Sequence, residues 1–257
     1  MKKPNNNNET LSHKRHTLAH LLGSTVLEIY PDAKNAIGPS IDNGFYYDFE
    51  FKNPVTEKDI KAIEDKMKET LKSWKEFTHK EVSEKEAKEH FKNNPYKLEL
   101  IDEIAKKGEK ITLYTVGNFT DLCRGGHAEN PNKDIEKGSW KLSHVAGAYW
   151  RGNEKNKMLT RIYGLAFDTN EDLKNYEKMR EEAEKRDHKK LGRELDLFTF
   201  SPLVGQGLPL WTPKGTILRN NLDSFIWSLR SMKDYERVEI PHITKKDLYI
   251  TSGHWDK

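Results

Sequence analysis

Hydrophobic residues recur at intervals of three, four and seven positions in the first thirty residues, which is the spacing of one face of an α-helix. This apolar stripe consists of Leu11, Leu18, Leu22, Val26 and Ile29. The pattern predicts a helix that ends at about Tyr30 and Pro31. His16 and His20 are four positions apart and lie on roughly the opposite side of this helix. Both imidazoles are therefore expected to project together into solvent or into a cleft, where they can exchange protons.

The next part of the chain mixes the periods of strands and helices. Strand-like runs cover residues 44–49, 111–116, 140–145 and 158–167. Helices are expected after two capping residues, Thr56 and Ser83, and over residues 98–104. The fold class predicted for residues 11–170 is α+β, with helices on a mostly antiparallel sheet. Residues 1–10, with four consecutive asparagines, are predicted to be a disordered leader.

A second block follows a charged segment. Residues 171–194 carry many charges and few apolar side chains, which is typical of a helix that links two domains. Residues 195–200 open this block, residues 214–232 read as a helix with an apolar face, and residues 235–240 read as a strand. One helix, a strand or two and loops do not make a core, so residues 195–257 are expected to be an incomplete domain.

Composition narrows the class of protein. Charged residues make up 33% of the chain and hydrophobic residues 35%. No apolar run approaches the roughly 20 residues of a membrane span, so a membrane partner is not expected. Cys123 is the only cysteine, which excludes an intrachain disulfide and favours a reducing, cytoplasmic location. The net charge of +3 permits a nucleic-acid partner without requiring one.

Candidate chemistry gathers in two short segments. His16 and His20 form one pair, and Cys123 and His127 form another with the same spacing. Such residues suit a tetrahedral zinc site. They also suit metal-free hydrolysis, in which a histidine acts as general base on water. The residues alone leave both readings open.

Seven segments match a known family in order along the chain. They are HTLAHLLG (16–23), AIGPSIDNGFYYD (36–48), PYK (95–97), DLCRGGH (121–127), AGAYWRG (146–152), RDHKKLG (186–192) and TSGHW (251–255). In these segments the chain resembles the amino-terminal half of threonyl-tRNA synthetases of the bacterial type, from about residue 11 to the last residue.

The resemblance implies a different function for each of the two blocks. Residues 11–170 would be the editing domain, which hydrolyses serine from the acceptor end of mischarged tRNA(Thr). Residues 195–257 would begin the class II aminoacylation domain, with motif 1 at about 214–241 forming the interface of a homodimer. The groups that bind ATP, magnesium and zinc for aminoacylation would lie beyond the last residue.

The resemblance also implies roles for individual residues. The catalytic set would be His16, His20, Lys97, Cys123 and His127. The substrate-binding set would be Tyr47, Asp121 and Arg124. His16 and Lys97 would hold or activate the water, and no metal is expected for editing. If zinc is present, its ligands would be His16, His20, Cys123 and His127.

One position departs from the family pattern, and two alternative functions remain. Gly126 stands where the family usually has proline, so a more mobile loop is expected there. The first alternative is a zinc-dependent, stand-alone editing hydrolase of the alanyl type. The second is a tRNA-binding module without activity.

Overall fold

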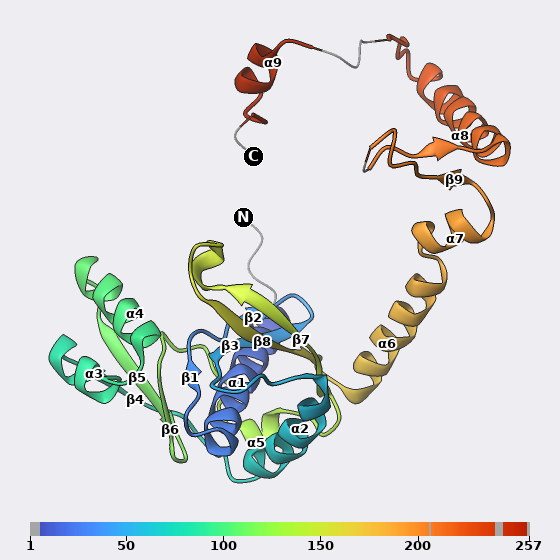
Figure 1. Cartoon of the computed structure of the whole chain (residues 1–257). Helices are drawn as coiled ribbons and strands as arrows, with labels where there is room; N and C mark the ends of the chain where they lie inside the picture. Colours follow the sequence, from blue (N-terminus) through green and yellow to red (C-terminus); the bar gives the residue numbers. More distant parts are fainter. Residues whose placement is uncertain (1–5, 206, 240–243, 256–257) are drawn as a thin grey trace. The chain divides into compact units, whose positions relative to one another are not determined.

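The computed structural model describes residues 6–205, 207–239 and 244–255 (Figure 1). The chain divides into two compact units, one up to Arg180 and one from Glu181. This division falls within the predicted linker, which forms two helices, α6 (Asn170–Lys185) and α7 (His188–Glu194). Asp187 begins the second helix because its carboxylate accepts hydrogen bonds from the backbone N–H groups of Lys189 and Lys190.

The first unit is built around a five-stranded antiparallel sheet in the order β1-β3-β8-β7, with β2 pairing on β3. Its strands are β1 (Lys34–Asn35), β2 (Ser40–Ile41), β3 (Gly44–Glu50), β7 (Trp140–Tyr149) and β8 (Met158–Ala166). Strand β3 alternates in the way its sequence predicts, since Phe45, Tyr47 and Phe49 all enter the main core.

Two helices pack against this core face of the sheet, α1 (Asn6–Ile29) and α2 (Glu57–Leu71). Helix α2 begins at the predicted cap, where Thr56 and Asp59 form a capping box. Helix α1 already begins at Asn6, inside the predicted leader, while residues 1–5 lie outside the described residues. A short helix, α5 (Pro131–Asp134), lies in the connection before β7.

A second, three-stranded antiparallel sheet has the order β4-β5-β6. Its strands are β4 (Thr78–Val82), β5 (Ile111–Val116) and β6 (Phe119–Leu122). Helices α3 (Glu84–His90) and α4 (Pro95–Lys106) pack against it through a small cluster that includes Ala87, Ile101 and Leu113. Mixed helices and antiparallel sheets confirm the α+β class.

Helix α1 is buried on nearly all sides at its middle. The stripe residues Leu18, Leu22 and Val26 are buried as predicted, but so are Thr17 and His20 on the other sides. The histidines therefore face the interior of a cleft rather than open solvent.

The second unit has few regular elements. They are β9 (Phe198–Thr199), β10 (Leu210–Trp211), α8 (Pro213–Ser231) and α9 (Lys246–Thr251), besides α7. The predicted helix 214–232 is present as α8. The predicted strand 235–240 is not formed over its described part, 235–239, where no neighbouring strand supplies hydrogen bonds. Ile240 lies outside the described residues.

None of the described helices is both long enough and apolar enough to span a membrane.

Candidate functional site

A cavity of about 410 Å³ in the first unit brings the predicted residues together. Its inner wall comes from α1, α4 and the end of β6, through His16, His20, Lys97, Asp121 and Cys123. The 37–39 loop also lines the cavity and lies against the ring of Tyr47, since a Cβ on Gly38 would come 2.2 Å from that ring. Three cations reach the cavity from the end of α4, the start of β5 and the loop after β6, namely Lys107, Lys110 and Arg124.

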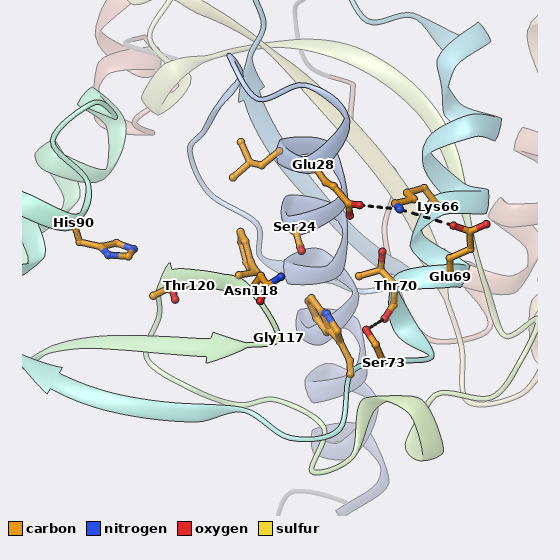
Figure 2. A pocket seen from close by; sticks show the side chains of 13 residues that line it. Ser24, Glu28, Lys66, Glu69, Thr70, Ser73, His90, Gly117, Asn118 and Thr120 are labelled. Carbon is orange, nitrogen blue, oxygen red and sulfur yellow. Dashed lines mark hydrogen bonds and ion pairs between the residues drawn. The ribbon is translucent and has the colours of Figure 1, made fainter.

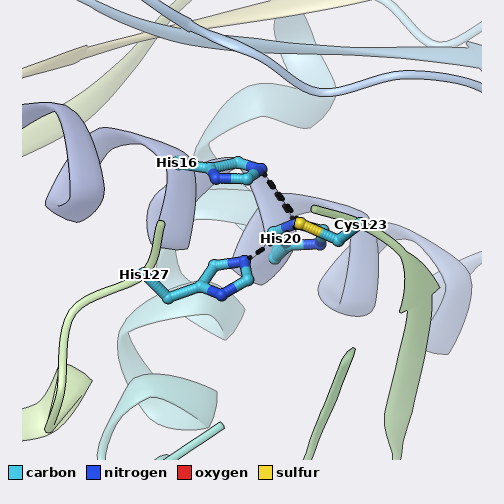
Figure 3. Close-up of side chains that lie close together, drawn as sticks. All are labelled: His16, His20, Cys123 and His127. Carbon is cyan, nitrogen blue, oxygen red and sulfur yellow. Dashed lines mark hydrogen bonds between the residues drawn. The ribbon is translucent and has the colours of Figure 1, made fainter. Parts of the chain in front are cut away.

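The two sequence pairs meet in one cluster (Figure 3). The ligand-type atoms of His16, His20, Cys123 and His127 all lie within 4.8 Å of one another. The Nε2 atoms of His16 and His20 are 3.1 Å apart. The Sγ of Cys123 lies 3.6 Å from Nε2 of His16 and 3.4 Å from Nε2 of His127. The backbone N–H of Gly125 also donates to this sulfur, at 3.3 Å.

Neighbouring acceptors determine which ring nitrogen of each histidine carries hydrogen. His16 Nδ1 lies 3.1 Å from the carbonyl oxygen of Gly126, and a carbonyl only accepts, so Nδ1 of His16 is the donor. His20 Nδ1 lies 3.3 Å from the carboxylate of Asp121, within ion-pair distance but without hydrogen-bond geometry. In the neutral form of His16, the unprotonated ring nitrogen is therefore Nε2, which faces the centre of the cluster.

Charges within the cluster are set by its own contacts. Burial raises the pKa of the Cys123 thiol, but its contacts with His127, His16 and His20 outweigh this effect and lower the pKa to about 4. Burial lowers the pKa of His20, but its contacts with Asp121 and Cys123 outweigh this effect and raise it to about 9. At neutral pH the cluster thus pairs a thiolate with an imidazolium. Burial, only partly offset by the thiolate, lowers the pKa of His127, which stays neutral.

Behind the histidines lies a buried ion pair. Lys97 Nζ is 2.5 Å from Oδ1 of Asp121, and both side chains are 2% exposed. Lys97 stands in the first turn of α4, which Asn94 caps by accepting hydrogen bonds from the backbone N–H groups of Tyr96 and Lys97. A cation there opposes the helix dipole. The pairing with Asp121 is therefore what makes the position tolerable for an ammonium group.

The carboxylate of Asp121 faces three donors. Its Oδ1 accepts from Lys97 and from the backbone N–H of Leu122 at 2.8 Å, while its Oδ2 accepts from the Tyr47 hydroxyl at 2.5 Å. Burial would raise the pKa of Asp121, but the charge of Lys97 and the contact with His20 outweigh it and hold the pKa well below its usual range. Burial and the charge of Asp121 raise the pKa of Tyr47 well above its usual value. Tyr47 is therefore a permanent donor to a permanent carboxylate.

Not every predicted residue reaches the cavity. Tyr47 is fully buried behind Asp121 and is not part of the cavity wall. His127 also lies behind the wall, stacked between Phe77 and His16 with ring centroids 4.0 and 4.7 Å away. Arg124 stands at the wall and pairs with Glu109.

Sequence reasoning missed two contributors, the buried Asn35 and the half-buried Asn94. Asn35 donates to the Tyr47 hydroxyl at 2.9 Å, and Asn94 donates to Asn35. An Asn before Pro95 is a recognised helix-start signal and would have pointed to Asn94. Asn35 carries no such signal.

The cluster fits a zinc ion by donor type. One thiolate and three imidazoles are common zinc ligands, and the 3.1–3.6 Å separations are close to the roughly 3.3–3.6 Å edges of a zinc tetrahedron. His16 donates from its other ring nitrogen to a carbonyl oxygen, as ligating histidines do, whereas Nδ1 of His20 faces Asp121 without hydrogen-bond geometry. Zinc held by all four residues would have no position left for water, whereas catalytic zinc sites keep one open.

A larger cavity of about 930 Å³ lies elsewhere in the first unit (Figure 2). Its charged side chains pair with one another, since Lys66 lies 2.8 Å from Glu28 and 3.9 Å from Glu69. The cysteine–histidine cluster does not line it. The smaller cavity is therefore the candidate for chemistry.

Comparisons with known proteins identify relatives of this chain. Residues 111–163, which include Asp121, Cys123 and His127, match the family model of the threonyl and alanyl tRNA synthetase second additional domain. Proteins named threonine-tRNA ligase from Staphylococcus epidermidis and Flavobacterium psychrophilum are 47% and 48% identical over 96% and 94% of this chain. The ligase of Borreliella burgdorferi is 45% identical over 100% of the chain.

The chain spans about two fifths of these relatives, covering 38%, 37% and 44% of their lengths. The resemblance found in the sequence is thus confirmed, and this chain is related along nearly its whole length to threonyl-tRNA synthetases.

Proposed function

We propose that the first unit hydrolyses the ester bond of seryl-tRNA(Thr), the proofreading step of a threonyl-tRNA synthetase. One observation carries this proposal. A histidine pair, a thiolate and a buried Lys97–Asp121 pair converge on one cavity, in a chain whose relatives are named threonine-tRNA ligases. The match to a domain described for both threonyl and alanyl synthetases supports the same assignment.

In the proposed step, His16 acts as general base through its unprotonated Nε2. It takes a proton from water, whose oxygen attacks the carbonyl carbon of the ester. The bond from that carbon to the ribose oxygen then breaks, and the ribose oxygen takes the proton back. The products are serine and free tRNA, with no oxidant or reductant required.

Lys97 is proposed to stabilise the oxyanion that forms on the carbonyl oxygen. Two of its three N–H groups are directed at Asp121 and at the Tyr47 hydroxyl, 3.2 Å away. The third is left for the water or the ester oxygen, in a site from which bulk water is largely excluded.

Cys123 is proposed to act as a charge rather than as a nucleophile. Water hydrolyses an ester without a covalent intermediate, and the thiolate stands beside Nε2 of His16, where positive charge develops. His20, which lines the cavity, is proposed to contact the terminal adenosine and the ester. His127 lies behind the cavity wall and contacts Cys123 and His16 instead.

Selectivity for serine is proposed to arise from size. A methyl group changes binding by only about 1–3 kcal/mol, so an aminoacylation site cannot reject serine sufficiently. A cavity that admits serine and excludes the extra methyl of threonine would correct those errors.

The mouth of the cavity is proposed to meet the sugar-phosphate backbone of the tRNA end. Lys110 and Arg124 are paired with Glu81 and Glu109. Lys107 has no ion-pair partner within the described part of the chain. It is the cation proposed to contact a phosphate group.

The decisive experiment is deacylation by the purified chain of tRNA(Thr) charged with serine or with threonine. Serine should be released and threonine largely retained. His16→Ala and His20→Ala should each lower the rate by roughly 10²–10⁴. His144→Ala, an exposed histidine on β7, should leave the rate unchanged. Tight tRNA binding without hydrolysis would instead support a binding module.

For the second unit we propose correspondence to the start of the aminoacylation domain. The matches to ligases extend through it, since one covers the whole chain. Helix α8 exposes apolar side chains that would suit a homodimer interface; they are Leu218, Leu222, Phe225, Ile226 and Leu229. For the longer ligases as a class, we propose ATP-dependent aminoacylation in the cytoplasm. ATP, magnesium and zinc would be bound by regions of those ligases that lie outside the match to this chain.

A further inference from the structure

An unbroken series of hydrogen bonds joins two asparagines outside the cavity wall to the carboxylate of Asp121. Asn94 Nδ2 donates to Oδ1 of Asn35 at 3.0 Å and to its backbone oxygen at 2.8 Å. Asn35 Nδ2 donates to the Tyr47 hydroxyl at 2.9 Å, and this hydroxyl donates to Asp121 at 2.5 Å. We infer that Asn35 and Asn94 are positioning residues of the hydrolytic site, acting by fixing the direction of the Tyr47 hydroxyl hydrogen. This inference rests on the function proposed above.

The direction of the series is set at the start of helix α4. Asn94 Oδ1 accepts from the backbone N–H groups of Tyr96 and Lys97 at 3.2 and 3.3 Å. An amide has its acceptor on one side and its donors on the other. The cap therefore forces Nδ2 of Asn94 to face Asn35. This donor in turn forces Oδ1 of Asn35 to face Asn94, and Nδ2 of Asn35 to face Tyr47.

The Tyr47 hydroxyl then has a single arrangement. Its oxygen accepts from Asn35 and from Lys97, 3.2 Å away, and it has one hydrogen to give. Both of those neighbours are donors, so the hydrogen points to Asp121. The tyrosine ring is held in place as well, because a Cβ on Gly23 would come 2.9 Å from it.

The consequence reaches the cavity through Asp121. Its Oδ2 receives the Tyr47 hydrogen and lies 3.3 Å from Nδ1 of His20, while its Oδ1 holds Lys97. The carboxylate of Asp121 therefore positions both His20 and Lys97. If the Tyr47 hydrogen turned away, Oδ2 would lose its hydrogen-bond donor and the position of the carboxylate would no longer be fixed.

A plain structural role is the alternative, in which Asn94 only caps α4. Asn94→Asp separates the two roles because aspartate caps a helix as well as asparagine does. Its side chain has no N–H, so Asn35 would turn its amide over to donate to the new carboxylate. Oδ1 of Asn35 would then face Tyr47 and draw the hydroxyl hydrogen away from Asp121.

The test uses the whole chain with seryl-tRNA(Thr) as substrate. Asn94→Asp should lower kcat by roughly 10–100-fold with little change in KM, the usual size of an effect transmitted through an outer hydrogen-bond partner. Asn94→Ser caps α4 without adding a charge, so its kcat should lie between those of the unmodified chain and Asn94→Asp. In the Tyr47→Phe background, Asn94→Asp should lower kcat no further, because the hydroxyl through which it acts is gone.

Ser83→Ala is the matched control, since it removes the side-chain cap of the neighbouring helix α3 and should leave kcat unchanged. Equal losses of kcat with and without the Tyr47 hydroxyl would overturn the inference and leave only a capping role. An active chain whose rate is unaffected by Asn94→Asp would overturn it too, while the proposed function would stand.

A readout independent of activity completes the test. Nuclear Overhauser contacts from the Asn35 side-chain amide protons to the Tyr47 ring should be present in the unmodified chain and lost in Asn94→Asp. If these contacts persisted in the variant, the inference would be overturned, whether or not the chain hydrolyses seryl-tRNA(Thr). A lack of hydrolysis by the unmodified chain would reject the proposed function.

Discussion

Lys97 and Asp121 form an ion pair at 2.5 Å although both side chains are 98% removed from solvent. Their partners come from parts of the chain that are remote from both: Tyr47 in β3 and His20 in α1. Taking two charges out of water costs several kcal/mol per ion, so a buried pair is weak evidence for added stability. This pair is better explained by the positions that Asp121 gives to Lys97 and His20 beside the cavity.

Removing one partner should therefore cost much more than removing a surface pair. Lys97→Met leaves the Asp121 carboxylate buried and uncompensated, and we expect the first unit to lose roughly 3–5 kcal/mol of unfolding free energy. Urea unfolding measured by hydrogen exchange in peptides of this unit checks the value, because the two units need not unfold together.

Lys88→Met is the matched control for that measurement. Lys88 lies 2.6 Å from both Glu84 and Asp102 on the surface, where water screens the charges and the loss of such a pair costs little stability. Similar losses at both lysines would contradict the importance assigned to the buried pair.

The thiolate and imidazolium give the stability of the first unit a distinctive pH dependence. The pKa of His20 is raised to about 9, so its contribution is complete below its unfolded value of 6.5 and is lost as the pH rises through 9. The pKa of Cys123 is lowered to about 4, so its contribution is complete above its unfolded value of 9.0 and is lost as the pH falls through 4.

Summed over the two groups, stability should rise from pH 4 to 6.5 and stay level from 6.5 to 9. In the level range, the folded and unfolded states each bind one proton at this pair, on His20 or on Cys123. The lowered pKa of His127 adds to the rise, because a depressed histidine contributes above 6.5 and loses its contribution as the pH falls. Hydrogen exchange over this pH range, with chelator present, measures the curve.

Cys123→Ser provides the contrast for that curve. Without the thiolate, His20 alone remains perturbed by Asp121, and stability should then decrease between pH 6.5 and the remaining folded pKa of His20. A level curve in this variant would show that His20 is not protonated in the folded chain.

The grouping of the candidate side chains was largely predictable from short sequence patterns. The four-residue spacing of His16 and His20 on one helix, and the matching segment with Cys123 and His127, lead to a cluster in which all four side chains meet. The capping residues Thr56 and Ser83 begin their helices as expected. These features depend on local geometry, which a sequence contains directly.

Features that depend on packing between distant parts of the chain were harder to predict from the sequence. Strand β4 exposes the side chains of all its residues except Val82, so no alternation marks it, and it forms by pairing with β5. Helix α1 is buried on sides that a single stripe does not reveal. Asn35 gains its role only because Asn94, 59 residues later, comes within hydrogen-bond distance.

Metal content distinguishes the two chemistries that the donor set permits. We expect elemental analysis of chain purified without chelator to find well under one zinc per chain, and chelator to leave serine release intact. A zinc ion bound by all four side chains would have no coordination position left for water. Stoichiometric zinc that is lost together with activity would instead establish the alanyl-type mechanism.

Lys107 and Lys106 allow the proposed phosphate contact to be tested with adjacent residues. Both are exposed lysines at the end of α4, where either charge suits the helix dipole, but only Lys107 lines the cavity. Lys107→Gln should raise KM for seryl-tRNA(Thr) and reduce the slope of log kcat/KM against log salt by roughly 0.7–1, the change for one lost phosphate contact. It should not affect hydrolysis of 3′-O-seryl-adenosine, which carries no phosphate. Lys106→Gln should leave both substrates unchanged; equal effects of the two substitutions would reduce the role of Lys107 to general surface charge.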